Sequence, residues 1–479
     1  MPETTSKTPN RYVQLLTNTA VFTVGKLLSK LLVFFMIGLY TACLSREEYS
    51  TADLIVNLAN LLIPLSCAGI TEGIFRSAAG RGNKEAFFTN GLLVYGVGSV
   101  IFLALSPLIG FLPFFEGSVW LVAAYVVVAN LHSVVSQYLC AIGHTKLFAG
   151  QGILNTALVI GFNILFLPVL DFGVAGYVGS TILADLITTV FLVCVTRLWR
   201  AVKPETVSRG TVGEMLRFCL PLVPTTLFWW ITGVSDRYMV AWMCSEELNG
   251  LYAVAYKVPN LLIYAISIFD SAWKLSVSAE NDPKAYAVFY SKVWRVYTTL
   301  AFLGGGCLIL ASRVCANILF AAEFEEAWVY IPTLTFATVF TALCTFLGSV
   351  YFASRRTVGS MLTAMAGAAL NITLNFLLIP TYAAMGASVA TFASYFAVCL
   401  IRLATGRRLI PFKGEWGRLT VNTLLMGALT AVVTLSEGDV LPVHLMYGVA
   451  AGIFVIMLAF NARAIMELLK DGKRMLRGR

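Results

Sequence analysis

The chain has 479 residues, of which 58% are hydrophobic and only 12% are charged, and it carries a formal net charge of +9. Soluble domains contain about 25% charged residues. One soluble core does not bury so much apolar surface, so a soluble protein is excluded and lipid must surround most of the chain. The basic residues are dispersed among the connections between apolar segments and form no shared face, which argues against a nucleic-acid partner.

Apolar segments long enough to cross a bilayer recur along the whole chain. A hydrocarbon core of about 30 Å requires roughly 20 apolar residues per helix, and barrel strands are much shorter. We therefore predict an all-α polytopic membrane protein with about fourteen transmembrane helices. The predicted spans are 18–43, 51–75, 87–112, 118–141, 147–169, 173–197, 214–243, 249–273, 290–320, 327–353, 358–380, 385–404, 415–435 and 442–462. The segment 18–43 is too long for a signal-peptide core, so we expect it to be retained as the first helix.

The connections between these spans alternate in charge. Cytoplasmic loops of membrane proteins are enriched in Lys and Arg. If both termini are cytoplasmic, the outer connections hold acidic residues and a single basic one, Arg46. The inner connections then hold the basic clusters, at 76–84, 146, 197–217, 274–295, 355–356, 402–418 and 463–479. The charge pattern predicts a multi-pass protein of the cytoplasmic (inner) membrane with both ends in the cytoplasm and contacts to membrane lipids.

Short patterns repeat about 200 positions apart. Ser45-x-Glu47 corresponds to Ser245-x-Glu247, and the run 60–63 corresponds to 260–263, both reading Asn-Leu-Leu-Ile. A further match joins Asn163, Pro168, Gly176 and Thr181 to Asn375, Pro380, Gly386 and Thr391. Such repeats are typical of transporters. They predict two pseudo-symmetric six-helix lobes, residues 1–205 and 206–408, followed by two C-terminal helices and a basic cytoplasmic tail at 409–479.

Two stretches carry a resemblance to a known family. One runs from Leu44-Ser45-Arg46-Glu47-Glu48-Tyr49 to Gly69-Ile70, and the other contains Leu220-Pro221-Leu222-Val223-Pro224, Asp236-Arg237 and Gly250-Leu251-Tyr252. They resemble bacterial oligosaccharide and polysaccharide flippases of the multidrug, oligosaccharidyl-lipid and polysaccharide exporter superfamily. The resemblance implies two lobes around a central cavity that opens to alternate sides. It also implies, as substrate, a polyprenyl-pyrophosphate-linked oligosaccharide moved to the outer leaflet for cell-surface polysaccharide assembly, with polysaccharide polymerase machinery as a partner.

Ionisable residues at bilayer depth usually face the bundle interior, because a charge in lipid costs several kcal/mol. Lys26 and Lys30 lie four residues apart on the predicted first helix, and Lys257 and Arg237 lie in later helices. These cations suit a pyrophosphate headgroup. The alternatives are ion pairs within the protein for the lysines and contact with outer headgroups for Arg237. Asp185, in the middle of the sixth span, is the candidate for ion coupling, with a static salt bridge as its alternative.

A polar and aromatic stripe recurs at helical spacing in the eighth span, at Tyr252, Tyr256 and Asn260. Aromatic rings stack on the C–H faces of sugars, and amides or phenols bind their hydroxyls, so the stripe is a candidate carbohydrate path. Its alternative is a set of interhelical hydrogen bonds. With Lys26, Lys30, Lys257 and Arg237, these residues form the predicted substrate-binding set.

No Walker A motif or zinc-ligand spacing occurs in the sequence. We therefore predict no metal and no bound cofactor, with transport driven by a proton or sodium gradient or by the substrate gradient. The protein is expected not to be an enzyme, because a membrane glycosyltransferase or polymerase needs a sizeable outer loop. The sequence is also compatible with a multidrug or cation antiporter, a lipid II flippase or a sporulation-type relative.

Overall fold

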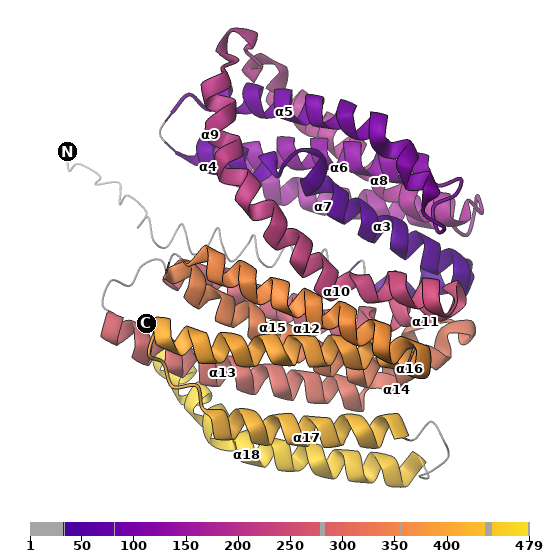
Figure 1. Cartoon of the computed structure of the whole chain (residues 1–479), viewed down its shortest axis with the longest axis vertical. Coiled ribbons are helices and arrows are strands. Elements are labelled where there is room, and N and C mark those ends of the chain that lie inside the picture. The colour runs from indigo at the N-terminus through magenta and orange to yellow at the C-terminus, as the bar shows by residue number, and fades with distance from the viewer. Residues whose placement is uncertain are drawn as a thin grey trace, which may run out of the picture.

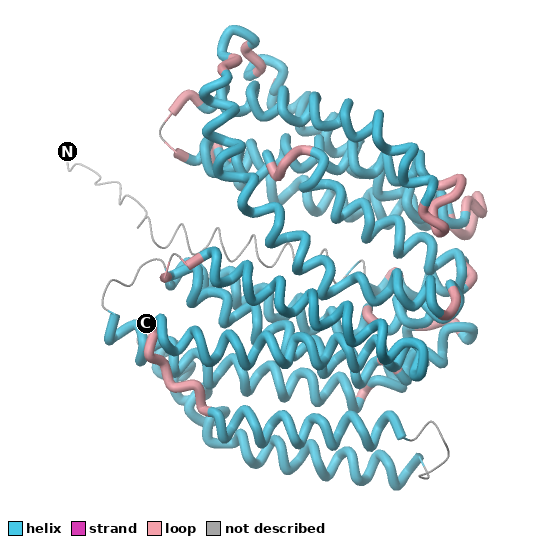
Figure 2. The backbone as a smooth tube through the Cα atoms, in the orientation of Figure 1, coloured by secondary structure: helices cyan, strands magenta, loops and turns pink. Residues whose placement is uncertain are grey.

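The computed structural model describes residue 32 and residues 34–80, 82–277, 283–354, 356–435 and 443–477. This part of the chain is almost entirely helical and contains no strand, which confirms the predicted all-α class (Figure 1; Figure 2). The helices of its first half are α2 (Ile37–Cys43), α3 (Arg46–Ser66), α4 (Ile70–Ala79), α5 (Lys84–Leu105), α6 (Val119–Ala141), α7 (Thr145–Phe166), α8 (Gly173–Thr196), α9 (Arg209–Cys219) and α10 (Val223–Met243). Those of its second half are α11 (Glu246–Ala255), α12 (Lys257–Val277), α13 (Pro283–Leu310), α14 (Ser312–Leu319), α15 (Ile331–Ala353), α16 (Thr357–Leu409), α17 (Trp416–Thr434) and α18 (Val443–Arg477).

The helices form two groups, which we call the N-lobe (α3–α8) and the C-lobe (α10–α16). Helix α10 of the C-lobe runs obliquely along the boundary with the N-lobe, and α17 and α18 pack on the far side of the C-lobe against α13 (Figure 1). The lobes meet at one end and diverge towards the other (Figure 1).

Most of the spans predicted from hydropathy correspond to described helices, and one of them is sharply bent. Ten described helices are long and apolar enough to cross a membrane, or eleven if the pair α3–α4 counts as one span bent by 56°. The bend follows from left-handed backbone at Ala68 (φ 51°) and Gly69 (φ 66°), which ends one helix and starts the next. Asn130 of α6 donates to the Ile63 carbonyl oxygen just before the bend, at 3.0 Å. The predicted total of fourteen spans stays a prediction.

Helix α16 contains two predicted spans, 358–380 and 385–404, joined at Ala383, whose backbone angles are not helical. The chain reverses there. A Cβ on Gly386 would touch the Leu378 carbonyl group, and Asn371 donates to Thr391 at 3.3 Å across the two limbs. Only glycine permits this close approach. The single element is therefore a helical hairpin.

The two ends of the molecule differ in charge. At the acidic end, which comprises the connections 44–45, 112–118, 167–172, 244–245 and 320–330, the lobes meet. At the basic end, which comprises 80, 82–83, 142–144, 197–208, 354, 356 and 410–415, they diverge (Figure 1). This segregation agrees with the predicted topology, while the orientation in the membrane remains a prediction.

The repeated serines perform the same local task. Ser45 caps α3, accepting from the Glu48 amide at 3.2 Å, and Ser245 caps α11, accepting from the Leu248 amide at 3.1 Å. An N-terminal serine satisfies amides that have no helical partner. These equivalent helices pack against each other, because Gly250 lets α11 approach the backbone of α3. The repeat therefore forms the contact between the lobes at the acidic end.

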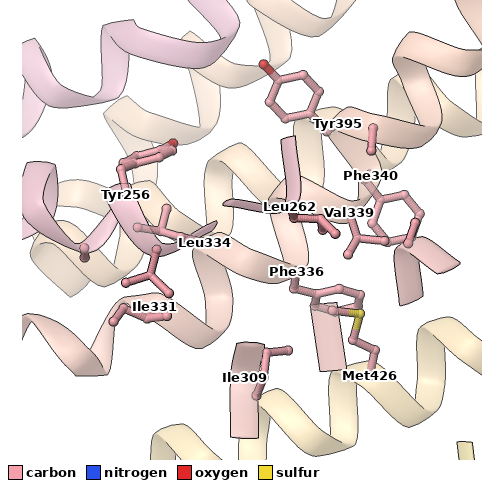
Figure 3. Close-up of a cluster of buried hydrophobic side chains, with 14 of the residues drawn as sticks. Tyr256, Leu262, Ile309, Ile331, Leu334, Phe336, Val339, Phe340, Tyr395 and Met426 are labelled. Atoms are coloured by element: carbon pink, nitrogen blue, oxygen red, sulfur yellow. The ribbon is translucent and has the colours of Figure 1, made fainter. Parts of the chain in front are cut away.

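The largest hydrophobic core lies in the C-lobe and extends to α17 and α18. Its centre contains Phe336, Phe340 and Met426, and the rings of Tyr256 and Tyr395 lie at its edge (Figure 3). Two smaller clusters fill the N-lobe. The clusters also cross the contact between the lobes, because Tyr49 of α3 belongs to the largest one and Ala241 of α10 belongs to one of the smaller ones.

Candidate functional site

A buried carboxylate of the N-lobe faces two cations of the C-lobe near the acidic end. Asp53 of α3 forms an ion pair with Arg237 of α10 through Oδ2. Its Oδ1 accepts from Lys257 Nζ at 3.2 Å. Asp53 and Arg237 are 4% and 7% exposed, whereas a quarter of the Lys257 side chain is accessible. In a low-dielectric interior these charges stabilise one another, and any one left alone would be costly.

The backbone at the start of α12 explains the place of Lys257. Helix α11 ends at Ala255 and α12 begins at Lys257, with Pro259 in its first turn, where a missing amide hydrogen costs nothing. The backbone stays helical at Tyr256 between the two helices, and the Asn260 amide donates to the Tyr256 carbonyl oxygen at 3.3 Å. Lys257 therefore continues the path of α11, and its Nζ reaches Asp53.

A second carboxylate organises the interior of the C-lobe. Asp236 Oδ2 accepts hydrogen bonds from Tyr252 at 2.7 Å, Tyr256 at 2.9 Å and Thr391 at 3.0 Å. Asp236 is fully buried. The guanidinium of Arg237 also lies over the Tyr256 ring, 4.5 Å from its centre. Two of the predicted sugar-binding tyrosines therefore hold Asp236 in this conformation.

A cavity of about 240 Å³ adjoins this network. Arg237, Tyr256 and Asn260 line it, together with Thr391 and Tyr395. The Arg237 Nε has no hydrogen-bond acceptor among the described residues. The cavity is thus lined by hydroxyl, amide and guanidinium groups, which suit a polar or anionic ligand.

A separate polar cluster lies in the middle of the N-lobe. Asp185 of α8 accepts from Asn155 of α7 at 2.7 Å and lies 3.0 Å from His132 Nδ1 of α6. The other ring nitrogen of His132 lies 2.9 Å from Gln151 Oε1. The two ring nitrogens therefore face a carboxylate oxygen and an amide oxygen. The cluster is a polar network of four side chains from α6, α7 and α8.

The predicted site residues fall into three places. Lys257, Arg237, Tyr252, Tyr256 and Asn260 come together between the lobes and around the cavity. Asp185 lies apart in the N-lobe, bonded to His132 and Asn155. Lys26 and Lys30 lie outside the described residues.

Sequence reasoning missed Asp53 and His132. Asp53 lies inside an apolar span, and a charge at that depth is itself the signal that could have found it. His132 stands in a long apolar run, and Gln151 and Asn155 lie four residues apart, on one face of the next helix. Two polar side chains on one face of an apolar helix indicate a polar partner in a neighbouring helix.

Comparison with solved structures identifies the fold. An inward-facing multidrug resistance MATE family transporter of the MOP superfamily matches with a TM-score of 0.65 at 16% identity, over 80% of this chain and 94% of that one. An outward-facing MATE structure gives 0.57 at 17% identity, over 82% and 95%. The lipid II flippase MurJ, in an inward closed conformation, gives 0.62 at 15% identity, over 95% and 100%. The described helices therefore have the fold of these transporters.

Sequence comparison identifies the family. No curated protein matches this chain significantly. The family described as polysaccharide biosynthesis protein matches residues 15–273, more than half of the chain. The predicted resemblance to exporters of this superfamily is confirmed. The chain is a multi-pass membrane protein that belongs to the polysaccharide biosynthesis protein family.

Proposed function

We propose that this protein is a flippase that moves a polyprenyl-pyrophosphate-linked oligosaccharide from the inner to the outer leaflet of the cytoplasmic membrane. The family and the transporter fold support a membrane flippase or exporter. The observation that carries the choice of substrate is the pair of cations, Arg237 and Lys257, facing one carboxylate across the lobe contact. A pyrophosphate offers the same oxygen chemistry as that carboxylate, with more charge.

The proposed step is an exchange of anions. In the structure Asp53 is the counter-ion that both cations share, and it links the lobes near the acidic end. A headgroup phosphate that binds Lys257 takes the place of the Asp53 carboxylate. Asp53 of the N-lobe then loses the cations that stabilise its buried negative charge. The closed state loses stability only while substrate is bound, so opening of the acidic end becomes coupled to loading. The lipid tail stays in the bilayer throughout.

The proposed orientation places the basic end in the cytoplasm. The lobes diverge at this end, and the TM-score is higher for the inward-facing MATE structure than for the outward-facing one. Substrate made at the cytoplasmic leaflet then enters between basic connections and leaves past acidic ones. That charge gradient favours capture on one side and release on the other.

Energy coupling is assigned in this proposal to Asp185. Together with His132 it forms a partly buried acid–base pair within hydrogen-bond distance. Protonation changes the charge of the pair, which is the property required of a coupling site in a secondary transporter. The coupling ion in this scheme is the proton, and no bound cofactor takes part.

A drug or cation antiporter of the same fold is the second candidate. The Asp185 carboxylate favours it, since an acidic group within a lobe attracts cations. The inter-lobe cations oppose it, because a cationic drug that passes between the lobes would meet Arg237 and Lys257. An assay with both substrate types therefore decides between the two.

The test is reconstitution into liposomes with a fluorescent polyprenyl-pyrophosphate oligosaccharide, measuring its protection from a membrane-impermeant quencher. We expect Lys257→Ala to reduce the rate at least tenfold and Lys257→Arg to retain more activity. The matched control is Arg313→Gln, because Arg313 stacks on Trp328 within the C-lobe, 5.2 Å from its ring centre. Unchanged flipping in Lys257→Ala, or export of an organic cation instead, would contradict the proposal.

A further inference from the structure

A second and larger cavity lies at the basic end of the C-lobe. Its volume is about 840 Å³, and its walls come from the end of α15 and both limbs of the α16 hairpin. No residue of the N-lobe takes part. A site on one lobe alone does not serve a substrate that must pass between the lobes, so this cavity needs its own explanation.

The mouth of the cavity is cationic. Arg356, just before α16, and Arg408, near its end, both line it, and both are exposed. The described residues that form its walls include no carboxylate. Two exposed arginines at the same mouth repel each other unless an anion lies between them.

A third arginine lies beneath the floor. Arg402 is 2% exposed, and its hydrogen-bond partners among the described residues are hydroxyl and carbonyl oxygens, with no carboxylate. Its guanidinium donates to Thr363 Oγ1 at 2.9 Å, and Thr363 lines the cavity. Neutral acceptors satisfy its hydrogen bonds, with the Cys344 carbonyl oxygen at 2.8 Å, but leave its charge uncompensated. The cavity therefore lies in a positive field from below as well as at its mouth.

The side walls are apolar and exposed. Val358, Leu362 and Ile401 are 64%, 49% and 40% exposed, and all three line the cavity. Exposed apolar side chains of a membrane-spanning helix suit contact with acyl chains. Apolar walls below a cationic mouth match the two parts of a lipid, its acyl chains and its phosphate.

We propose that this cavity binds an anionic phospholipid of the leaflet at the basic end, with the phosphate between Arg356 and Arg408 and an acyl chain along Leu362. Basic pockets between transmembrane helices are a recognised form of such sites. The lipid would join the two limbs of α16, the same segments that Arg402 links through Ser360 and Thr363. Arg402 also lies 4.8 Å from the ring centre of Trp229 in α10, so the site adjoins the helix between the lobes.

The test is native mass spectrometry of the purified protein with phosphatidylglycerol, and with phosphatidylcholine as the zwitterionic comparison. We expect phosphatidylglycerol to bind more tightly. Arg356→Gln combined with Arg408→Gln should weaken it by about tenfold for each arginine, because each removes a charge-assisted hydrogen bond. The matched control is Arg407→Gln, an exposed neighbour that does not line the cavity. Replacing both arginines with lysine should restore part of the affinity.

Folding is checked by the melting temperature without lipid, which should be the same in all variants since the substituted side chains are exposed. Equal binding of the two phospholipids, or unchanged affinity in the double glutamine variant, would overturn the proposal. Tighter binding of a polyprenyl pyrophosphate than of phosphatidylglycerol, lost in the same variant, would also overturn it, because the cavity would then belong to the substrate.

Discussion

Lys257 Nζ lies 3.2 Å from Oδ1 of Asp53, although 204 positions separate the two residues in the chain. A cation at the start of α12 in the C-lobe is thereby neutralised by a carboxylate of α3 in the N-lobe. Arg237 shares the same carboxylate. Closure of the acidic end therefore brings both cations to the carboxylate that they share.

Asp53→Asn should shift the protein away from the state closed at the acidic end. The substitution leaves two cations without their carboxylate, and removing one partner of a buried ion pair costs about 3–5 kcal/mol. Spin labels at Glu116→Cys and Ala322→Cys, in a variant without native cysteines, would report the distance between the lobes. We expect longer distances in Asp53→Asn.

The control for that experiment is Arg46→Gln. Arg46 also links the lobes, through Glu326 at 3.3 Å, but Glu326 is largely exposed. An exposed ion pair contributes roughly 0–1 kcal/mol. Equal distance distributions in Asp53→Asn and the unsubstituted protein would show that Asp53 does not hold the lobes together.

Gly250→Ala should destabilise the contact between α3 and α11 by steric overlap. A Cβ at this position would meet the backbone carbonyl group of Arg46, which cannot rotate away. Overpacking of this kind costs roughly 1–3 kcal/mol. Gly179→Ala is the matched control, because a Cβ there meets nothing within 4 Å. The thermal unfolding midpoint in detergent should fall for Gly250→Ala only, and a fall of equal size in both variants would refute the steric account.

Tyr252→Phe should lower the stability of the C-lobe. It removes a 2.7 Å hydrogen bond to Asp236, whose carboxylate has no access to solvent. Loss of a hydrogen bond to a buried charge costs roughly 1.5–3 kcal/mol. Tyr382→Phe, at a position that is 61% exposed, serves as comparison. Denaturant unfolding of the two variants measures the difference, and we expect no change for Tyr382→Phe.

Asp185→Asn and His132→Gln should each uncouple transport from the proton gradient. Both remove the titratable pair but keep the volume and most of the hydrogen bonding of the cluster. In proteoliposomes we expect flipping that no longer accelerates when a pH gradient is imposed, while substrate binding stays within about twofold. Thr156→Val, next to Asn155 on α7, tests for a general effect of altering this helix. Retained gradient dependence in both variants would exclude the cluster from coupling.

Local properties of the chain decided the class of fold. Length and hydropathy of a segment determine whether it is helical in lipid, so the spans were predictable without knowledge of their neighbours. The caps at Ser45 and Ser245 were equally local, and the repeat between them was visible as spacing. The hairpin within α16 was predicted as two spans, because its turn interrupts the hydropathy near Pro380.

Only the tertiary structure decided which charges meet. The sequence presents Asp53, Arg237 and Lys257 as isolated charges in three apolar segments, and their pairing depends on how α3, α10 and α12 cross. The same holds for His132, which acquires a partner only when α8 packs beside α6. The physical reason is the distance along the chain over which each property is determined. Helix formation in lipid is fixed by a segment's own backbone and side chains, whereas an ion pair requires two segments to be brought within about 4 Å by the packing of everything between them.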